Sequence, residues 1–365
     1  MRRRAHRAGP AALAVACALA GAAVGVAASS AGASSRIASA ATVVYPDDPG
    51  IRYTEYARAT VMHAGAVFDR PGVPNGNGIA SPGTRINFRT DATRVSVMVT
   101  YTFACGALGC GHFSAERDGR LLPPSFGSDV ASGAGTYLIA TQVSPATRSY
   151  SIIWPYGTQM VFNGLALDGG SHHLVSPAPA RPARLYVAYG DSITQGYYAS
   201  AGTTHTYPDQ VARKKNWSVI NMGFGGEPTV PSDGSAVGKL HGNIVTVAIG
   251  ANDWGQSKAL GTFVSDYNGL LDAIRALQPT VPLYCLTPIW TGLEGVQNGQ
   301  GLYVHDYRQA ITQIVQQRMA TDPNLHLIDG LTLVPNQLRY FVDGVHPNDA
   351  GFALYASNLA AKLAL

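Results

Sequence analysis

The chain has 365 residues, which fits two domains better than one, since a domain averages about 150 residues. Only 13% of the residues are charged and 46% are hydrophobic, which excludes a highly charged, disordered protein. The formal net charge is +4, but residues 1–36 hold five arginines and no acid. The remainder carries 21 basic and 22 acidic residues, a net charge of −1. This near-neutral body excludes nucleic acid and anionic membranes as main partners.

The first residues have the pattern of an export signal. Residues 1–7 are basic, residues 11–28 are apolar, and Ala31-Gly32-Ala33 has the small-residue spacing of a cleavage site. A retained membrane anchor is the alternative, but the segment is mostly alanine and glycine, which insert poorly into lipid. The sequence therefore predicts a signal peptide over residues 1–33 and a secreted, extracellular protein with no stable membrane association after cleavage.

Three cysteines follow the predicted signal. Cys105 and Cys110 enclose a glycine-rich segment that can turn back on itself, so we expect a disulfide between them in an oxidising compartment. Half of a metal site is the alternative, but the sequence has no second pair. Cys285 lies in an apolar, strand-like run and is predicted to be a buried free thiol.

Short alternating runs of apolar residues over 43–167 predict an all-β sandwich domain. They lie at residues 86–88, 95–103, 137–141, 150–153 and 161–167. Residues 168–184 contain three prolines and a Gly-Gly pair, which is typical of a linker or a stiff crossing between domains.

Residues 185–365 instead alternate strand-like and helix-like segments, which predicts an α/β domain with a parallel sheet covered on both faces. Strands are expected at 185–189, 219–222, 243–249, 282–287 and 326–328, and helices near 206–215, 264–277, 304–320 and 349–364. In such sheets the chemistry lies beyond the carboxyl ends of the strands.

The first of these strands runs into Gly190-Asp191-Ser192, which places a serine hydroxyl on the turn after the strand. Such a serine is a candidate nucleophile, and a helix-capping serine is the ordinary alternative. Near the C-terminus, Asp343 precedes His346 by three residues with Gly344 between them and Pro347 after them. A tight turn there lets Asp343 fix the histidine tautomer, and an exposed loop is the alternative.

Two further post-strand loops contain candidate donors for an oxyanion. The loop 223–227 is glycine-rich, so its backbone N–H groups can approach a ligand. In the other loop Asn252 has a side-chain amide that can donate, and we expect Asp253 to orient it. Taken singly, each loop also reads as a simple turn.

In order and spacing, Gly190-Asp191-Ser192, Gly226, Gly250-x-Asn252-Asp253 and Asp343-x-x-His346 resemble the four signature blocks of the SGNH (GDSL-type) hydrolase superfamily. The resemblance covers residues 185–365 and implies an SGNH-type three-layer α/β domain. It further implies the architecture of two-domain secreted carbohydrate esterases, with a jelly-roll-like sandwich first.

The resemblance also implies the roles of individual residues. Ser192 is the nucleophile, His346 is the general base and then the acid, and Asp343 orients it. The Ser192 and Gly226 N–H groups and the Asn252 side chain form the oxyanion hole, with Gly225 an alternative to Gly226. No metal or cofactor is expected, because the chain has no phosphate loop, dinucleotide fingerprint or zinc-protease helix.

Three aromatic residues near these motifs, Trp254, Trp290 and Tyr197, are candidates for binding a sugar or an acyl group, and core packing is the alternative. The leading hypothesis is a secreted serine esterase that removes short acyl groups, chiefly acetyl, from carbohydrate. The expected partner is an acylated carbohydrate or another small ester. A short-chain lipase or broad arylesterase is the rival enzyme, and a non-catalytic carbohydrate-binding protein is the alternative of another class.

Overall fold

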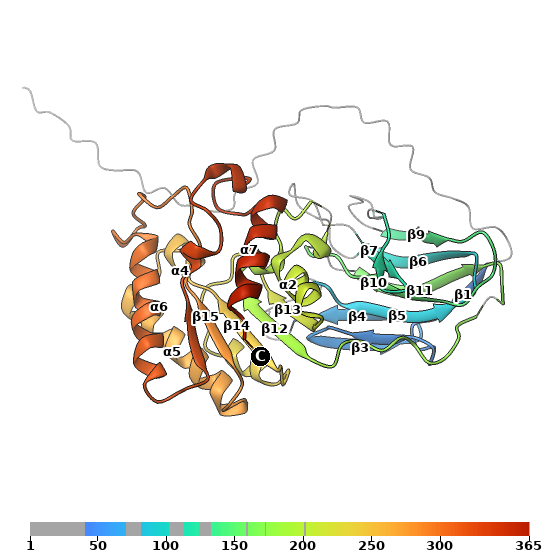
Figure 1. Cartoon of the computed structure of the whole chain (residues 1–365), viewed down its shortest axis with the longest axis horizontal. Coiled ribbons are helices and arrows are strands. Elements are labelled where there is room, and N and C mark those ends of the chain that lie inside the picture. The colour runs from blue at the N-terminus through green and yellow to red at the C-terminus, as the bar shows by residue number, and fades with distance from the viewer. Residues whose placement is uncertain are drawn as a thin grey trace, which may run out of the picture.

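The structure is a computed structural model that describes residues 41–70, 82–101, 113–123, 133–157, 160–171, 173–200 and 202–364. The chain forms two regions that lie end to end along its long axis (Figure 1). The N-terminal region is built of antiparallel strands, and the C-terminal region alternates parallel strands with helices. The predicted cleavage signal over residues 1–33 and the cysteines 105 and 110 lie outside the described residues.

Two antiparallel sheets form the N-terminal region. The first sheet has the order β3 (Arg58–Met62), β4 (Gly65–Asp69), β11 (Met160–Asp168), β6 (Arg94–Tyr101) and β9 (Gly133–Thr141), with β1 (Thr42–Val44) paired to β11. The second has the order β2 (Arg52–Thr54), β5 (Arg85–Thr90), β10 (Arg148–Ile153), β7 (Ser114–Arg117) and β8 (Arg120–Leu121). Alternate side chains of both sheets, such as Phe88 and Val97, share one buried core. The predicted all-β sandwich is confirmed.

The C-terminal region has one sheet of five parallel strands. Their order is β13 (Ser218–Gly223), β12 (Leu185–Gly190), β14 (Ile244–Ala248), β15 (Leu283–Leu286) and β16 (Leu325–Ile328). The α-helices are α1 (Ser192–Gln195), α2 (Tyr207–Lys215), α3 (Asp233–Gly238), α4 (Ala251–Gly255), α5 (Leu260–Leu277), α6 (Val304–Met319) and α7 (Asp349–Lys362). Short 3₁₀ turns occur at η1 (Thr203–His205), η2 (Gly330–Thr332) and η3 (Leu338–Tyr340).

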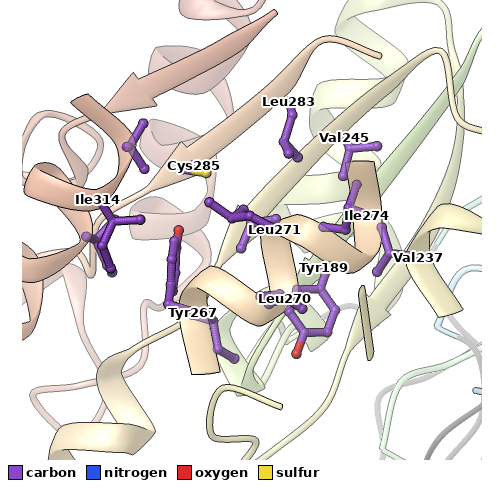
Figure 2. Close-up of a cluster of buried hydrophobic side chains, with 14 of the residues drawn as sticks. Tyr189, Val237, Val245, Tyr267, Leu270, Leu271, Ile274, Leu283, Cys285 and Ile314 are labelled. Atoms are coloured by element: carbon purple, nitrogen blue, oxygen red, sulfur yellow. The ribbon is translucent and has the colours of Figure 1, made fainter. Parts of the chain in front are cut away.

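Helices cover both faces of this sheet, so the predicted three-layer α/β fold is confirmed. On one face Tyr189, Val245 and Leu283 pack against α5 and α6 (Figure 2). On the other face Tyr186 and Leu286 pack against α2 and α7. Cys285 is fully buried in the first core and is free, as expected, and burial raises the pKa of its thiol to about 12.

The sandwich is joined to the α/β region by buried contacts. Tyr156, just after β10, lies in the α/β core and donates a hydrogen bond to the Ala199 carbonyl at 3.0 Å. Arg85, on β5, is 1% exposed and pairs with Asp209 of α2 at 2.9 Å. The same guanidinium contacts Glu55 and Glu116 of the sandwich. Burial opposes the charge on Arg85, but the three carboxylates raise its pKa above the ordinary value.

The segment after β11 lies against the second sheet of the sandwich. Leu174 forms an isolated bridge with Thr90, and the Val175 N–H donates to the Arg89 carbonyl at 2.8 Å. Arg181 pairs with Glu55 at 3.1 Å. The segment is therefore tied to the sandwich at residues 174, 175 and 181, on both sides of Pro177 and Pro179. Among the residues that the structure describes, no helix is long and apolar enough to cross a membrane.

Candidate active site

The site is built at the carboxyl edge of the parallel sheet, where β12 lies between β13 and β14. Gly190 at the end of β12 pairs with Gly223 of β13 and with Ala248 of β14. The loops that follow these three strands therefore begin at the same level. The strand order reverses at β12, since the chain passes to β13 on one side and then to β14 on the other, and ligands bind at such a switch point.

Ser192 begins the short helix α1 directly after β12. The cap of this helix is Asp191, whose Oδ1 accepts the Ile193 N–H at 2.9 Å. The Ser192 hydroxyl is thus not used as a helix cap, and the capping interpretation is wrong. Burial raises the pKa of Asp191 to about 6, although the Ile193 hydrogen bond opposes the shift. Asp191 braces the turn that presents Ser192.

A chain of two hydrogen bonds links Ser192, His346 and Asp343. The Ser192 hydroxyl lies 2.8 Å from Nε2 of His346, and Nδ1 of His346 lies 2.7 Å from Oδ2 of Asp343. An ionised Asp343 accepts the Nδ1 proton, which leaves the Nε2 lone pair directed at the serine. This is the geometry of a nucleophile, a base and an orienting carboxylate.

The loop that presents His346 is held by the Asp343 side chain and by a backbone hydrogen bond. Oδ1 of Asp343 accepts the N–H groups of Val345 and His346 at 2.9 and 2.8 Å. Gly344 has a φ of 83°, which an L side chain rarely adopts, and its carbonyl accepts the Gly292 N–H at 2.7 Å. Burial opposes ionisation of Asp343, but the bonds from His346 and Val345 outweigh it and lower its pKa to about 2. These bonds form the tight turn that the sequence predicts, and the Asp343 side chain within it is 37% exposed.

The expected oxyanion donors stand on the three neighbouring loops. The N–H groups of Ser192 and Gly226 and the Asn252 amide donate to no other residue in the described part of the chain, so they are free for a ligand. Gly226 has a φ of 77°, and its carbonyl accepts from Gln256 at 2.6 Å. A Cβ built on the alternative, Gly225, would be 3.9 Å from the Ser192 Cβ, whereas a Cβ built on Gly226 would have no atom within 4 Å.

Asp253 does not orient Asn252, contrary to expectation. Its carboxylate is buried and accepts the Thr229 N–H at 3.0 Å and the Thr229 hydroxyl at 2.9 Å. Lys258 pairs with the same carboxylate at 2.9 Å. Asp253 therefore ties the start of α4 to the loop after β13, and Asn252 is positioned by the helix backbone.

The three aromatic candidates lie in different surroundings. Tyr197 lies beside the site, with its ring centroid 5.1 Å from that of His346, and Trp290 lines a neighbouring cleft. Trp254 lines neither the site nor the cleft. It is 8% exposed, packs in the core with residues of α5 and α6, and donates to the Leu302 carbonyl at 3.1 Å. The short helix α4, absent from the sequence-based prediction, turns its ring inward. Tyr198, which the sequence analysis did not select, lies 5.7 Å from the His346 ring.

A narrow cleft opens beside the serine and the histidine. Its walls include Asp191 and Ile193, which flank Ser192, and Val345, which precedes His346. The remaining wall is mostly apolar: Ala248, Ile249, Ala251, Pro288, Ile289 and Trp290. Its empty volume, with the part open to solvent, is about 430 Å³. The described residues contain no cluster of His, Cys, Asp and Glu that would hold a metal ion, and the metal-free site stays a prediction.

Solved structures match most of the chain. A salicylyl-acyltransferase from a tetracycline biosynthetic pathway is 18% identical, with a TM-score of 0.77 over 89% of this chain and 98% of that one. A family two carbohydrate esterase from Clostridium thermocellum in complex with cellohexaose is 20% identical, with a TM-score of 0.65 over 86% of this chain and 98% of that one. An acetyl xylan esterase from the rumen bacterium Butyrivibrio proteoclasticus is 13% identical, with a TM-score of 0.59 over 86% of this chain and 97% of that one. The TM-scores establish a shared fold, and at identities this low they establish the fold alone.

A search of curated proteins finds no significant match to the sequence. A scan against protein families matches residues 188–354 to the GDSL-like Lipase/Acylhydrolase family. This range begins in β12 and ends in α7, so it includes Ser192, Gly226, Asn252 and the Asp343–His346 loop. The α/β region is therefore a domain of the GDSL-like Lipase/Acylhydrolase family, and the protein is a carboxylic ester hydrolase.

Proposed function

We propose that the protein is a secreted serine esterase that hydrolyses short-chain esters, chiefly acetyl esters, carried on carbohydrate. The observation that carries the esterase part is the hydrogen-bonded series Ser192, His346 and Asp343. The alternative of a non-catalytic carbohydrate-binding protein leaves this assembled series without a purpose.

The proposed reaction has two halves. The Ser192 oxygen attacks the ester carbonyl carbon while Nε2 of His346 takes the hydroxyl proton, and the imidazolium then gives that proton to the departing alcohol. Water attacks the acyl-serine in the same way, with His346 again accepting a proton, and Ser192 leaves with it. The negative charge on the carbonyl oxygen is stabilised by the donors at Ser192, Gly226 and Asn252.

The carbohydrate part of the proposal rests on fold and surroundings. Two proteins with this two-region fold are a carbohydrate esterase in complex with cellohexaose and an acetyl xylan esterase. Trp290 is half-buried at the cleft beside the serine, where an aromatic face can stack on a sugar ring. The near-neutral body and the N-terminal export pattern agree with an extracellular, uncharged carrier.

The apolar cleft favours a second candidate, a short-chain lipase or broad arylesterase, because an apolar wall accepts an acyl chain longer than acetyl. A panel of esters from acetyl to octanoyl, run beside acetylated polysaccharides, separates the two candidates. We expect the highest kcat/KM with acetyl esters and release of acetate from polysaccharide. A clear preference for octanoyl esters would replace the carbohydrate proposal with the lipase one, and Ser192→Ala is the blank for every substrate.

Export is tested separately, by the oxidation state of the cysteines in protein from the growth medium. In protein collected from the growth medium, Cys105 and Cys110 should be disulfide-bonded and the chain should lack its first residues. Cys285 is buried and should resist a thiol reagent until the protein is unfolded. Labelling of Cys105 and Cys110 in native, non-reduced protein would contradict the proposed pairing.

A further inference from the structure

The sandwich reaches the catalytic region through one arginine that the reaction scheme above does not use. Arg70 directly follows β4, the strand that points toward the α/β region in Figure 1. Its side chain is 4% exposed and lies between two carboxylates of the other region. Nη2 donates to Asp233 Oδ2 at 2.5 Å, and Nη1 donates to Glu227 Oε2 at 3.3 Å.

Arg70 also contacts aromatic rings around the same point. Its guanidinium carbon lies 5.7 Å from the ring centroid of Phe224 and 5.3 Å from that of Tyr189. The Tyr189 hydroxyl donates to the same oxygen of Asp233 at 3.1 Å. Phe224 and Glu227 are the two ends of the oxyanion loop, which we define as residues 224–227. One side chain of the sandwich therefore holds both ends of this loop.

The chain is held again at Thr229, which Asp253 binds, but residues 224–227 themselves have few other constraints on their position. Its middle is Gly225-Gly226, and glycine leaves the backbone free to take several conformations. The Phe224 N–H donates to Gly190 and the Glu227 N–H donates to Phe224, both through the backbone. The Gly226 carbonyl accepts from the exposed Gln256. An oxyanion donor must be fixed in advance of the reaction, so the anchors at the ends of this loop affect the rate directly.

The charges of the cluster make Arg70 necessary for this arrangement. Glu227 is 13% exposed and Asp233 is 4% exposed, and they face each other with one guanidinium between them. Burial raises the pKa of Glu227 to about 7, Arg70 opposes that shift, and Asp233 adds to it. Without Arg70 the pKa of Glu227 would rise further and Glu227 would take up a proton, so the charged contact that ties Glu227 and the adjacent Gly226 to the sandwich would be lost.

We propose that Arg70 is a positioning residue for the oxyanion loop, so that the sandwich sets the rate of ester hydrolysis through Glu227 and Phe224. The inference rests on the proposed esterase function. It assigns the sandwich a part in catalysis that requires no contact between the sandwich and the carbohydrate.

The test compares Arg70→Met with Arg58→Met in the full chain. Arg58 is the control, because it begins the neighbouring strand β3, is 56% exposed and pairs with Asp69 of the sandwich itself, not with a residue of the other region. For each variant we measure kcat and KM with 4-nitrophenyl acetate, per active site titrated with a phosphonate ester. We expect kcat to fall about 10- to 100-fold in Arg70→Met with KM within about twofold, less than the loss of a whole donor. Arg58→Met should match the wild type.

Two further variants keep the test decisive if Arg70→Met does not fold. Arg70→Lys keeps the charge and should recover part of the lost kcat. Glu227→Gln leaves the Arg70–Asp233 pair intact and should lower kcat several-fold. The rate at which the phosphonate modifies Ser192 should fall in parallel, since its oxygen occupies the oxyanion position. In the double variant Arg70→Met with Glu227→Gln, kcat should fall no further than in Arg70→Met alone.

A purely structural role would lower the melting temperature and the titratable fraction but leave kcat per active site unchanged. That result in Arg70→Met, or in Arg70→Lys and Glu227→Gln together, would overturn the proposal. Failure of the esterase function itself looks different: the wild type would not hydrolyse the ester, or Ser192→Ala would hydrolyse it as fast as the wild type.

Discussion

The α/β region and the sandwich use their polar side chains in opposite ways. In the α/β region Ser192, Asn252 and His346 stand on loops at one sheet edge, where a substrate can reach them. In the sandwich the notable polar groups, Arg70 and Arg85, are buried and directed at the other region. In the function that we propose, one region carries the chemistry and the other holds the loops that present it.

This contrast predicts that mutations in the two regions fail differently, and the largest effect belongs to the catalytic series. Ser192→Ala and His346→Ala should each lower kcat by at least about 10⁴-fold, because the nucleophile and its base act as one unit. The melting temperature should stay within a few degrees of the wild type, since neither side chain packs a core. Substantial hydrolysis by pure Ser192→Ala protein would contradict the assignment, and mass spectrometry should find an acyl adduct only on wild-type protein.

Asn252→Ala tests a single oxyanion donor. We expect kcat to fall by about 10²–10³-fold with little change in KM, because the amide acts on charge that develops in the transition state. Asp253→Asn is the comparison: Asp253 pairs with Lys258 and bonds to Thr229, so its loss should lower stability more than kcat. If Asn252→Ala changes only KM, the amide binds substrate instead.

The α/β region could be predicted from the sequence more completely than the sandwich, for physical reasons. The site of the α/β region follows strands directly, so a motif such as Asp343-x-x-His346 is local and visible in the sequence. The contact of Arg70 with Glu227 joins residues 157 positions apart, and no spacing rule connects them. The sequence predicts no strand at β1 to β4, β7 or β8; β1, β2 and β8 have only two or three residues, too few to show an alternation. For Trp254 the core-packing alternative holds, and the sequence could not decide it because a five-residue helix, too short to show a period, sets the direction of the ring.

Arg85→Met tests the support given by the sandwich. It would leave Asp209, Glu55 and Glu116 with less compensation in a buried place, which costs about 3–5 kcal/mol when one partner of a buried ion pair is removed. Denaturant unfolding should report this loss, while kcat per titrated active site should stay near the wild-type value. A stability change below about 1 kcal/mol would show that the network is not needed for folding.

The pH dependence separates the histidine from its neighbours. Asp343 has its pKa lowered to about 2, so its stabilising contribution is complete above the ordinary carboxyl value and is lost only as the pH falls through about 2. Asp343 therefore stays ionised across the working range of the enzyme, and the acid limb of the activity profile, a rise of about tenfold per pH unit, reports loss of a proton from the general base.

Glu227 also titrates near neutral pH, so Glu227→Gln is the control for this profile. The acid limb should persist in that variant, because it reports the general base of the reaction and the new Gln side chain does not titrate. Loss of the limb would assign it to Glu227. EDTA should change neither profile, and an enzyme that EDTA inactivates and zinc restores would contradict the metal-free site.

The smallest expected effects distinguish two tryptophans that look alike in the sequence. Trp290 lines the cleft, so Trp290→Leu should change kcat/KM only several-fold, with the change depending on the acyl group or the sugar. Trp254 is in the core, so Trp254→Leu should lower the free energy of unfolding by about 2 kcal/mol, since truncating a buried aromatic side chain removes packing. Its relative kcat/KM values for different esters should match those of the wild type. The same substitution thus yields a specificity change at one position and a stability change at the other. Equal losses on every ester in Trp290→Leu would assign that ring to packing against Phe341, its 5.3 Å neighbour, and leave the cleft without an aromatic contact to substrate.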